Sequence, residues 1–271
     1  MRRCSRVRCS GSAEVAATAA RTRPRLVLET LLILGISLGK SAVYSILNII
    51  NRLTYQVPLS EQTSTMNSAV TPDRPWLDLA YQLANNLLPF CAPFLAIYLL
   101  WRIWPPGPSP WRAIGLDGRR VGRDIALGVG LALLILGPAL GFYLLARQLG
   151  INTTIVMADL GSDSWTIPMY CLAAFQNGFL EEVVMIGYLT TRWRQSGWHP
   201  GAAIVVSALI RGSYHLYQGF GGFISNLVFG LLLGWLYQRT RRLWPLVIAH
   251  TVIDITAFVG YSLLAGVVGW L

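Results

Sequence analysis

Charged residues are scarce in this sequence. Asp, Glu, Lys and Arg make up 13% of its 271 residues, whereas they make up about 25% of a typical soluble domain. Hydrophobic residues account for 54% of the chain, and the mean hydropathy is +0.50. The shortage of charge excludes an ordinary soluble domain. The composition predicts an all-α membrane protein, a polytopic bundle of helices.

Cysteine is also rare, and several catalytic motifs are missing. The four cysteines, at positions 4, 9, 91 and 171, form no CxxC pair and give no disulfide framework. The sequence contains no H-E-x-x-H zinc-protease motif, no pair of membrane aspartates resembling an aspartyl site, and no convincing serine for a Ser/His dyad. The sequence therefore lacks the motifs that are typical of zinc-dependent, aspartyl and serine proteases.

Seven apolar segments approach the ~20 residues needed to cross a bilayer. They cover residues 26–50, 77–101, 125–146, 165–189, 201–217, 222–237 and 244–260. The apolar tail 261–271 is too short to span alone, so it either lengthens the last helix or forms a partial eighth. We therefore expect seven transmembrane helices, or eight with the tail. Small-residue pairs such as Gly137 with Gly141 and Gly230 with Gly234 are expected to let helices approach closely.

Basic residues are distributed unevenly between the connecting segments. Seventeen Lys and Arg residues fall in the N-terminal tail and the second, fourth and sixth loops, against three in the alternate loops. This asymmetry predicts a multi-pass protein of the cell membrane with its N-terminus in the cytoplasm. The net charge of +10 is thus a topology signal, and no nucleic-acid partner is expected. Residues 1–24 lack apolar periodicity and are predicted to be a disordered basic cytoplasmic tail, followed by a transmembrane domain over 25–271.

Three of the apolar segments carry polar side chains in pairs. One pair is adjacent in sequence, and the other two are each spaced by one helical turn. A charge at the bilayer centre costs at least ~2.5–3.5 kcal/mol, so such residues usually mark a functional site. The paired residues are Glu181 and Glu182, Arg211 and His215, and His250 and Asp254. We expect the three segments to fold together around one polar site.

The residue types in this set suit hydrolysis. Buried carboxylates can act as general bases near neutral pH, and histidine titrates in the same range and can also bind metal. Adjacent helical residues point ~100° apart, so one of Glu181 and Glu182 should face a cavity and the other a neighbouring helix. The set predicts a site that activates water, and a buried structural ion network is the alternative.

The three motifs resemble those of the CPBP family, the CAAX-protease and bacteriocin-processing (Abi-type) intramembrane peptidases. The family pattern is E-E-x-x-x-R, then F-x-x-x-H, then H-x-x-x-N/D on successive helices. The corresponding stretches here are EEVVMI at 181–186, RGSYH at 211–215 and HTVID at 250–254. The resemblance covers about residues 165–256.

The resemblance implies an intramembrane endopeptidase that cuts a membrane-tethered peptide or protein near the surface of the lipid bilayer. Glu181 would be the base that activates water, assisted by His215, and Glu182 a supporting carboxylate. His250 and Asp254 would bind the oxyanion. The resemblance does not decide whether a divalent metal such as zinc is bound. The candidate ligands are Glu181, His215 and His250.

The sequence departs from the family pattern at two positions. Ile186 stands where the pattern has arginine, and Arg211 stands where it has phenylalanine. We expect a compensating exchange in which Arg211 pairs with Glu182 from the neighbouring helix, because a buried charge needs a partner. The departures keep a second interpretation open, a non-catalytic relative that binds a peptide or serves as an immunity protein. A proton-coupled transporter is a third.

Overall fold

The computed structural model describes residues 24–103, 109–265 and 267. Residues 1–23 of the predicted disordered tail, with Cys4 and Cys9, therefore lie outside the described residues. The chain begins with a helix over Pro24–Ile36, which is bent by 57° from the next helix, α2 (Leu38–Thr54). The long loop that follows contains a short helical turn, η1 (Leu59–Glu61), and the strand β1 (Thr63–Thr65).

The second and third predicted spans are helical. The helices α3 (Pro75–Leu87), η2 (Leu88–Phe90) and α4 (Cys91–Ile103) follow one another without a gap. Short turns at α5 (Pro110–Ala113) and η3 (Gly118–Arg120) lead into the long helix α6 (Val121–Gln148). The strand β2 (Thr154–Val156) then pairs in parallel with β1, with Ser64 opposite Ile155.

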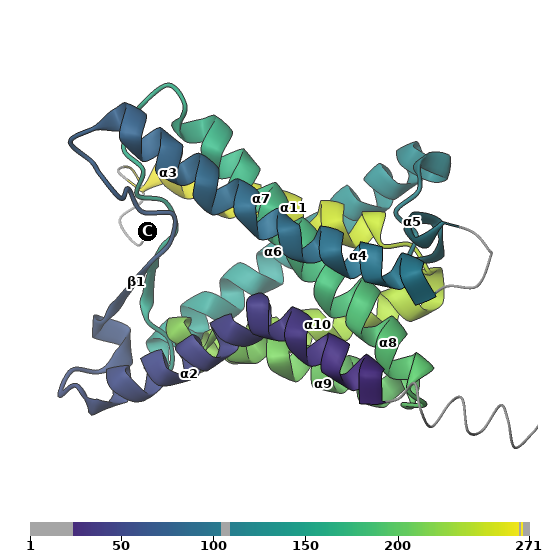
Figure 1. The fold of residues 1–271 in the computed structure, drawn as a ribbon. Coiled ribbons are helices and arrows are strands. Elements are labelled where there is room, and N and C mark those ends of the chain that lie inside the picture. The colour runs from purple at the N-terminus through teal and green to yellow at the C-terminus, as the bar shows by residue number, and fades with distance from the viewer. Residues whose placement is uncertain (1–23, 104–108, 266, 268–271) are drawn as a thin grey trace, which may run out of the picture.

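The remaining helices contain the three motifs. They are α7 (Thr166–Glu181), the π-helical stretch η4 (Glu182–Leu189), α8 (Thr190–Gln195), α9 (Pro200–Tyr214), the turn η5 (Leu216–Gln218), α10 (Phe220–Thr240) and α11 (Trp244–Leu264). Figure 1 shows α2, α9 and α10 in one group, and α3, α4 and α7 with α11 in a second group that crosses it. The pair β1 and β2 runs between the two groups at one end of the molecule.

The all-α class is confirmed, whereas the number of spans remains a prediction. Four helices in the described part of the chain are long and apolar enough to cross a membrane, or five if the bent N-terminal pair is one span. The helix α9 has 15 residues, fewer than the ~20 that cross a typical bilayer. The helix α11 continues to Leu264, so the first part of the apolar tail lengthens the last helix.

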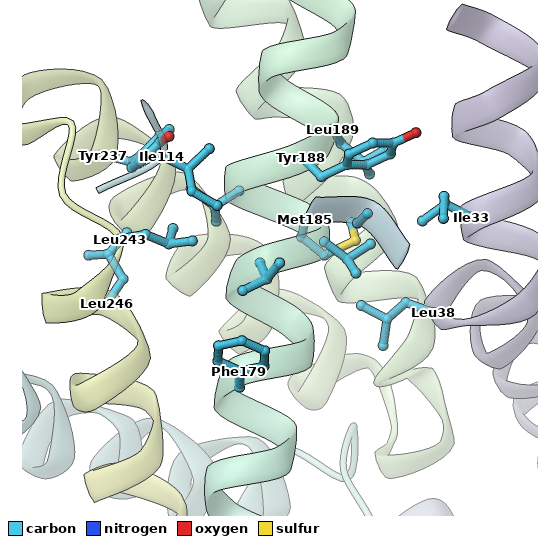
Figure 2. Close-up of a cluster of buried hydrophobic side chains, with 14 of the residues drawn as sticks. Ile33, Leu38, Ile114, Phe179, Met185, Tyr188, Leu189, Tyr237, Leu243 and Leu246 are labelled. Atoms are coloured by element: carbon cyan, nitrogen blue, oxygen red, sulfur yellow. The ribbon is translucent and has the colours of Figure 1, made fainter. Parts of the chain in front are cut away.

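The centre of the molecule is an apolar cluster around η4. All eight residues of η4 are buried, and Figure 2 shows Met185, Tyr188 and Leu189 surrounded by side chains from other elements. These include Ile33 and Leu38 from the N-terminal helices. The element that begins with Glu182 is therefore enclosed by other helices, which fixes where the carboxylates lie.

Close helix approach occurs at only some of the predicted small-residue pairs. A Cβ on Gly234 would lie 2.7 Å from Ile204, and one on Gly230 would lie 3.1 Å from Ala208, so α10 packs closely on α9 there. In contrast, a Cβ on Gly137 or Gly141 would meet nothing within 4 Å. The prediction of close packing is thus right for Gly230 and Gly234 and wrong for Gly137 and Gly141.

One of the two arginines of α8 is buried. Arg192 at the end of the fourth predicted span is 0% exposed. Its Nε donates to Glu29 of the first helix at 2.7 Å, and its Nη2 donates to the Leu99 carbonyl at 2.6 Å. The Tyr188 hydroxyl also donates to Glu29 at 2.7 Å. This polar cluster ties the N-terminal helix to α4 and α8.

Candidate functional site

The two adjacent carboxylates lie where the helix changes form. Glu181 is the last residue of α7 and Glu182 is the first residue of η4. Stretches of π-helix are rare and often occur at functional sites. One turn earlier, Gly178 allows α11 to approach, because a Cβ there would lie 2.8 Å from Thr251 Oγ1 and 3.1 Å from its backbone nitrogen. This contact brings α11, with His250, against the carboxylates.

Glu182 is the fully buried member of the pair. Its Oε1 accepts a hydrogen bond from Arg211 Nη2 at 2.5 Å and lies 2.8 Å from His250 Nδ1. Arg211 is 1% exposed, and its guanidinium lies 5.1 Å from the centre of the Phe229 ring. The ion pair expected between Arg211 and Glu182 is therefore present, and together with the contact to His250 it joins η4, α9 and α11 at one point.

Glu181 points in a different direction and is more accessible. Its Oε2 accepts a hydrogen bond from the Tyr214 hydroxyl at 2.7 Å, and Arg211 Nη2 lies 3.5 Å away. His215 Nε2 lies 4.0 Å from the same oxygen. The Glu181 side chain is 10% exposed, whereas that of Glu182 is 0% exposed. The two carboxylates therefore have different surroundings, as their adjacent positions in the helix required.

The His215 ring has no hydrogen bond within the described residues. Both of its nitrogens are buried and lack a partner, and the 4.0 Å to Glu181 is an ion-pair distance that exceeds a hydrogen bond. The rings of Tyr214 and Tyr217 lie 4.8 and 6.3 Å from the imidazole, centre to centre. Two nitrogens without a partner beside a carboxylate give the site unused hydrogen-bonding capacity for a polar reactant.

His250 and Asp254 lie together on α11, as the one-turn spacing predicted. His250 Nε2 is 3.7 Å from Asp254 Oδ1. The opposite carboxylate oxygen, Asp254 Oδ2, accepts a hydrogen bond from Asn177 Nδ2 at 3.3 Å. Asn177 is absent from the set predicted from sequence. Asn177 lies four residues before Glu181 and therefore on the same face of α7, and this spacing could have identified it from the sequence.

All six residues of the predicted site lie in one connected cluster. Glu181 is linked to His215 and Arg211, Arg211 to Glu182, Glu182 to His250, and His250 to Asp254. Tyr214 and Asn177 extend the cluster at its two ends. Buried polar groups in such a network are stabilised when most of them are paired. The groups that remain unpaired include both His215 nitrogens and Glu182 Oε2.

These side chains do not fit a metal ion. Among the described residues, no group of three or more His, Cys, Asp or Glu side chains is arranged to hold one. Arg211 Nη2 lies 2.5 Å from Glu182 and 3.5 Å from Glu181, so the two carboxylates already share a permanent cation. A divalent ion beside that guanidinium would be repelled. Glu181, His215 and His250, the candidate zinc ligands, are therefore not arranged as a metal site.

Comparison with known proteins identifies the segment that holds this cluster. Residues 163–256 match the family model for type II CAAX prenyl endopeptidases, described as Rce1-like. The match confirms the predicted resemblance over α7 to α11, which contain all three motifs. No curated protein and no solved structure matches the chain.

Proposed function

From this Rce1-like segment, we propose that the protein is an intramembrane endopeptidase in which Glu181 activates water to cleave a membrane-proximal peptide bond. The observation that carries the proposal is the setting of Glu181. It is the more accessible of two buried carboxylates, it is hydrogen-bonded by Tyr214 at 2.7 Å, and it lies 4.0 Å from an imidazole with two free nitrogens. A positioned carboxylate beside a histidine is a common arrangement for general-base catalysis.

In the proposed reaction, Glu181 and His215 act on water. Glu181 accepts a proton from a water molecule held between its carboxylate and His215, and the resulting hydroxide attacks the carbonyl carbon of the substrate. The protonated Glu181 then gives this proton to the leaving amine as the carbon–nitrogen bond breaks. Tyr214 donates to one oxygen of Glu181, which leaves the other oxygen free for water.

His250 is proposed to stabilise the negative charge that develops on the carbonyl oxygen. Glu182 is the partner of its Nδ1, so Nδ1 carries a proton while Glu182 is ionised and paired with Arg211. In the proposed reaction a second proton is placed on Nε2, which lies 3.7 Å from Asp254 Oδ1. The Nε2–H group would then be the donor to the oxyanion, a contact that gains strength as charge develops.

The substrate class follows from the family. A type II CAAX prenyl endopeptidase model suggests a peptide tethered to the membrane by a lipid close to its C-terminus. The partners would be this peptide or protein and the lipid bilayer, and the reaction would occur within a multi-pass membrane protein.

The proposal is tested by peptide cleavage in liposomes. Purified protein is reconstituted with fluorogenic peptides that carry a C-terminal farnesyl-cysteine motif, and products are identified by mass spectrometry. We expect wild-type protein to cleave and Glu181→Ala to lose at least about 100-fold in rate, the usual scale for a general base. Thr54→Val is the control, since the Thr54 hydroxyl donates to the Asn51 carbonyl within α2 and, among the described residues, to no residue of the site.

Two other outcomes would overturn the proposal. If the wild type binds the peptide with the same affinity as Glu181→Ala and neither cleaves it, the protein is a non-catalytic relative. If the liposomes acidify or alkalinise in step with solute uptake and no peptide is cut, the polar cluster relays protons in a transporter.

A further inference from the structure

The segment that follows His215 is held by residues far away in the chain. It comprises η5, Gly219 and the first turn of α10, residues 215–222. Because the His215 ring makes no hydrogen bond of its own, its place relative to Glu181 depends on the backbone of this segment. The groups that fix that backbone therefore set the imidazole's place together with α9, to which the His215 backbone nitrogen is bonded at the Gly212 carbonyl.

Two buried hydroxyl groups bind the carbonyls of this segment. Ser64 Oγ donates to the Tyr217 carbonyl at 2.8 Å. Thr153 Oγ1 lies 2.8 Å from Ser64 Oγ and 3.0 Å from the Gln218 carbonyl, which also accepts a bond from the Thr153 backbone nitrogen at 2.8 Å. Ser64 and Thr153 are 2% and 0% exposed. The two residues come from β1 and from the residue before β2, so the small sheet is joined to the segment through them.

The other end of the segment is held by the residues around Asn152. The Asn152 side-chain oxygen accepts a bond from the Gly222 nitrogen at 2.8 Å, and the Ile151 carbonyl accepts one from Gly221 at 3.1 Å. Gly219 has φ +108°, and a Cβ there would lie 2.6 Å from the Ile151 oxygen. The chain from 151 to 153 thus contacts the segment so closely that only glycine fits at 219.

None of these residues has a direct role in the proposed chemistry. Ser64, Asn152 and Thr153 carry no titratable group, and no hydrogen bond joins them to Glu181 or to the His215 ring. Burying hydroxyl and amide groups is unfavourable unless they are hydrogen-bonded, and here their bonds go to the backbone that follows His215. We propose that Thr153 and Ser64, supported by Asn152, are positioning residues that set the distance between His215 and Glu181. This inference rests on the proposed function.

The test separates the hydroxyl of Thr153 from its backbone bond. Thr153→Val keeps the backbone bond to Gln218 but removes the hydroxyl, and Thr153→Ser keeps both. We expect Thr153→Val to lower kcat about tenfold or more with KM within about twofold, because displacement of a catalytic group by 1 Å can cost up to about 100-fold. Thr153→Ser should restore kcat. Thr54→Val, which removes a hydroxyl that bonds only within α2, should match the wild type.

Two further measurements keep the result specific. Ser64→Ala should lower kcat similarly, and the double variant with Thr153→Val should be no worse than the more damaged single one, because the two hydroxyls act through one network. Hydrogen–deuterium exchange should become faster at the amides of residues 216–222 in Thr153→Val and stay unchanged in Thr54→Val. This second readout does not depend on any enzymatic activity.

The inference would be overturned if Thr153→Val kept the kcat of the wild type, or if exchange over residues 216–222 did not change. It would also fail if Thr153→Ser were as slow as Thr153→Val, since the hydroxyl would then not be the group that matters. If the wild type itself cleaved no peptide while exchange changed as expected, the proposed function would fail. The conclusion that Thr153 holds the backbone of residues 216–222 in place would be supported independently.

Discussion

Arg211 places a buried positive charge beside Glu181 and Glu182, and position 186, where the family pattern has arginine, holds isoleucine. Ile186 is 1% exposed and belongs to the apolar cluster around η4, so an arginine there would have to displace hydrocarbon side chains. From α9, Arg211 reaches Glu182 at 2.5 Å and Glu181 at 3.5 Å instead. The pairing of Arg211 with Glu182, which the departures at 186 and 211 led us to expect, is therefore present in the structure.

Removing Arg211 is expected to leave Glu182 as an unpaired buried carboxylate. Arg211→Ala should lower the free energy of unfolding by about 3–5 kcal/mol, the usual cost of breaking a buried pair from one side. Adding Glu182→Gln should recover part of that loss, because the neutral amide no longer needs a cation. Thermal unfolding in detergent measures both variants. The pairing would be contradicted if the double variant were no more stable than Arg211→Ala.

The same guanidinium is expected to keep metal ions away from the carboxylates. Wild-type protein incubated with zinc and desalted should retain far less than one zinc per chain, and a chelator should leave peptide cleavage unchanged. Arg211→Met removes the charge at similar volume and should increase zinc retention. Metal content by mass spectrometry is the readout. A zinc that stays with the wild type and is lost together with activity would refute the expectation.

At the scale of elements, the site depends on close contact between α7 and α11. Gly178 makes this contact possible, since a Cβ there would lie 2.8 Å from Thr251 Oγ1. The contact lies one turn from the carboxylates, so a side chain at 178 would move His250 away from Glu182. Gly178 therefore acts on the site through the distance between two helices.

Gly178→Val is expected to destabilise the protein by about 1–3 kcal/mol, the typical cost of overpacking, and to reduce cleavage by more than the stability loss explains. The matched control is Gly130→Val on α6, where an added Cβ meets nothing within 4 Å. Unfolding and cleavage are measured on the same preparations. Equal effects of the two variants would show that helix propensity, and not the contact between α7 and α11, causes the loss.

At the scale of the whole molecule, the sequence predicted which segments meet but not how they meet. The helical spacing of the paired polar residues was enough to place Arg211, His215, His250 and Asp254 on shared faces. The π-helical stretch and the short α9, which ends at Tyr214, have no clear sequence signal. The contact between Ser64 and Thr153 joins residues 89 positions apart. Single serines and threonines in short polar stretches do not reveal such pairing, because tertiary structure alone decides it.

A charged cluster fastens the connection before α6 to the turn between α10 and α11. Arg242 Nη1 donates to Asp117 at 2.6 Å, and the same guanidinium is hydrogen-bonded to Asp124. The hydrogen bond from Arg242 lowers the pKa of Asp117 below its ordinary 3.8. A lowered carboxylate pKa stabilises the folded state above the ordinary value, and this contribution is lost as the pH falls through the lowered one.

Unfolding temperature measured against pH is therefore expected to fall more steeply below about pH 4 in the wild type than in Asp117→Asn, which has no proton to gain at that position. The effect should be small, because Asp117 lies near the surface and solvent screens the pair. Above pH 5 the two curves should run parallel. Curves that stay parallel down to the lowest pH would show that Asp117 contributes no pH-dependent stability.

The distribution of basic residues gives the last prediction, the orientation of the molecule. Seventeen Lys and Arg residues against three predict that the Asp117–Arg242 cluster faces the cytoplasm and that the loop with β1 faces outward. In a variant with all four cysteines replaced by serine, Glu61→Cys should react with an impermeant maleimide in intact cells. Arg120→Cys should react only after lysis. Both positions are exposed in the structure, so unequal labelling reports the side of the membrane. The reverse pattern would contradict this orientation and would place the segment that follows His215, with the sheet that holds it, on the cytoplasmic side.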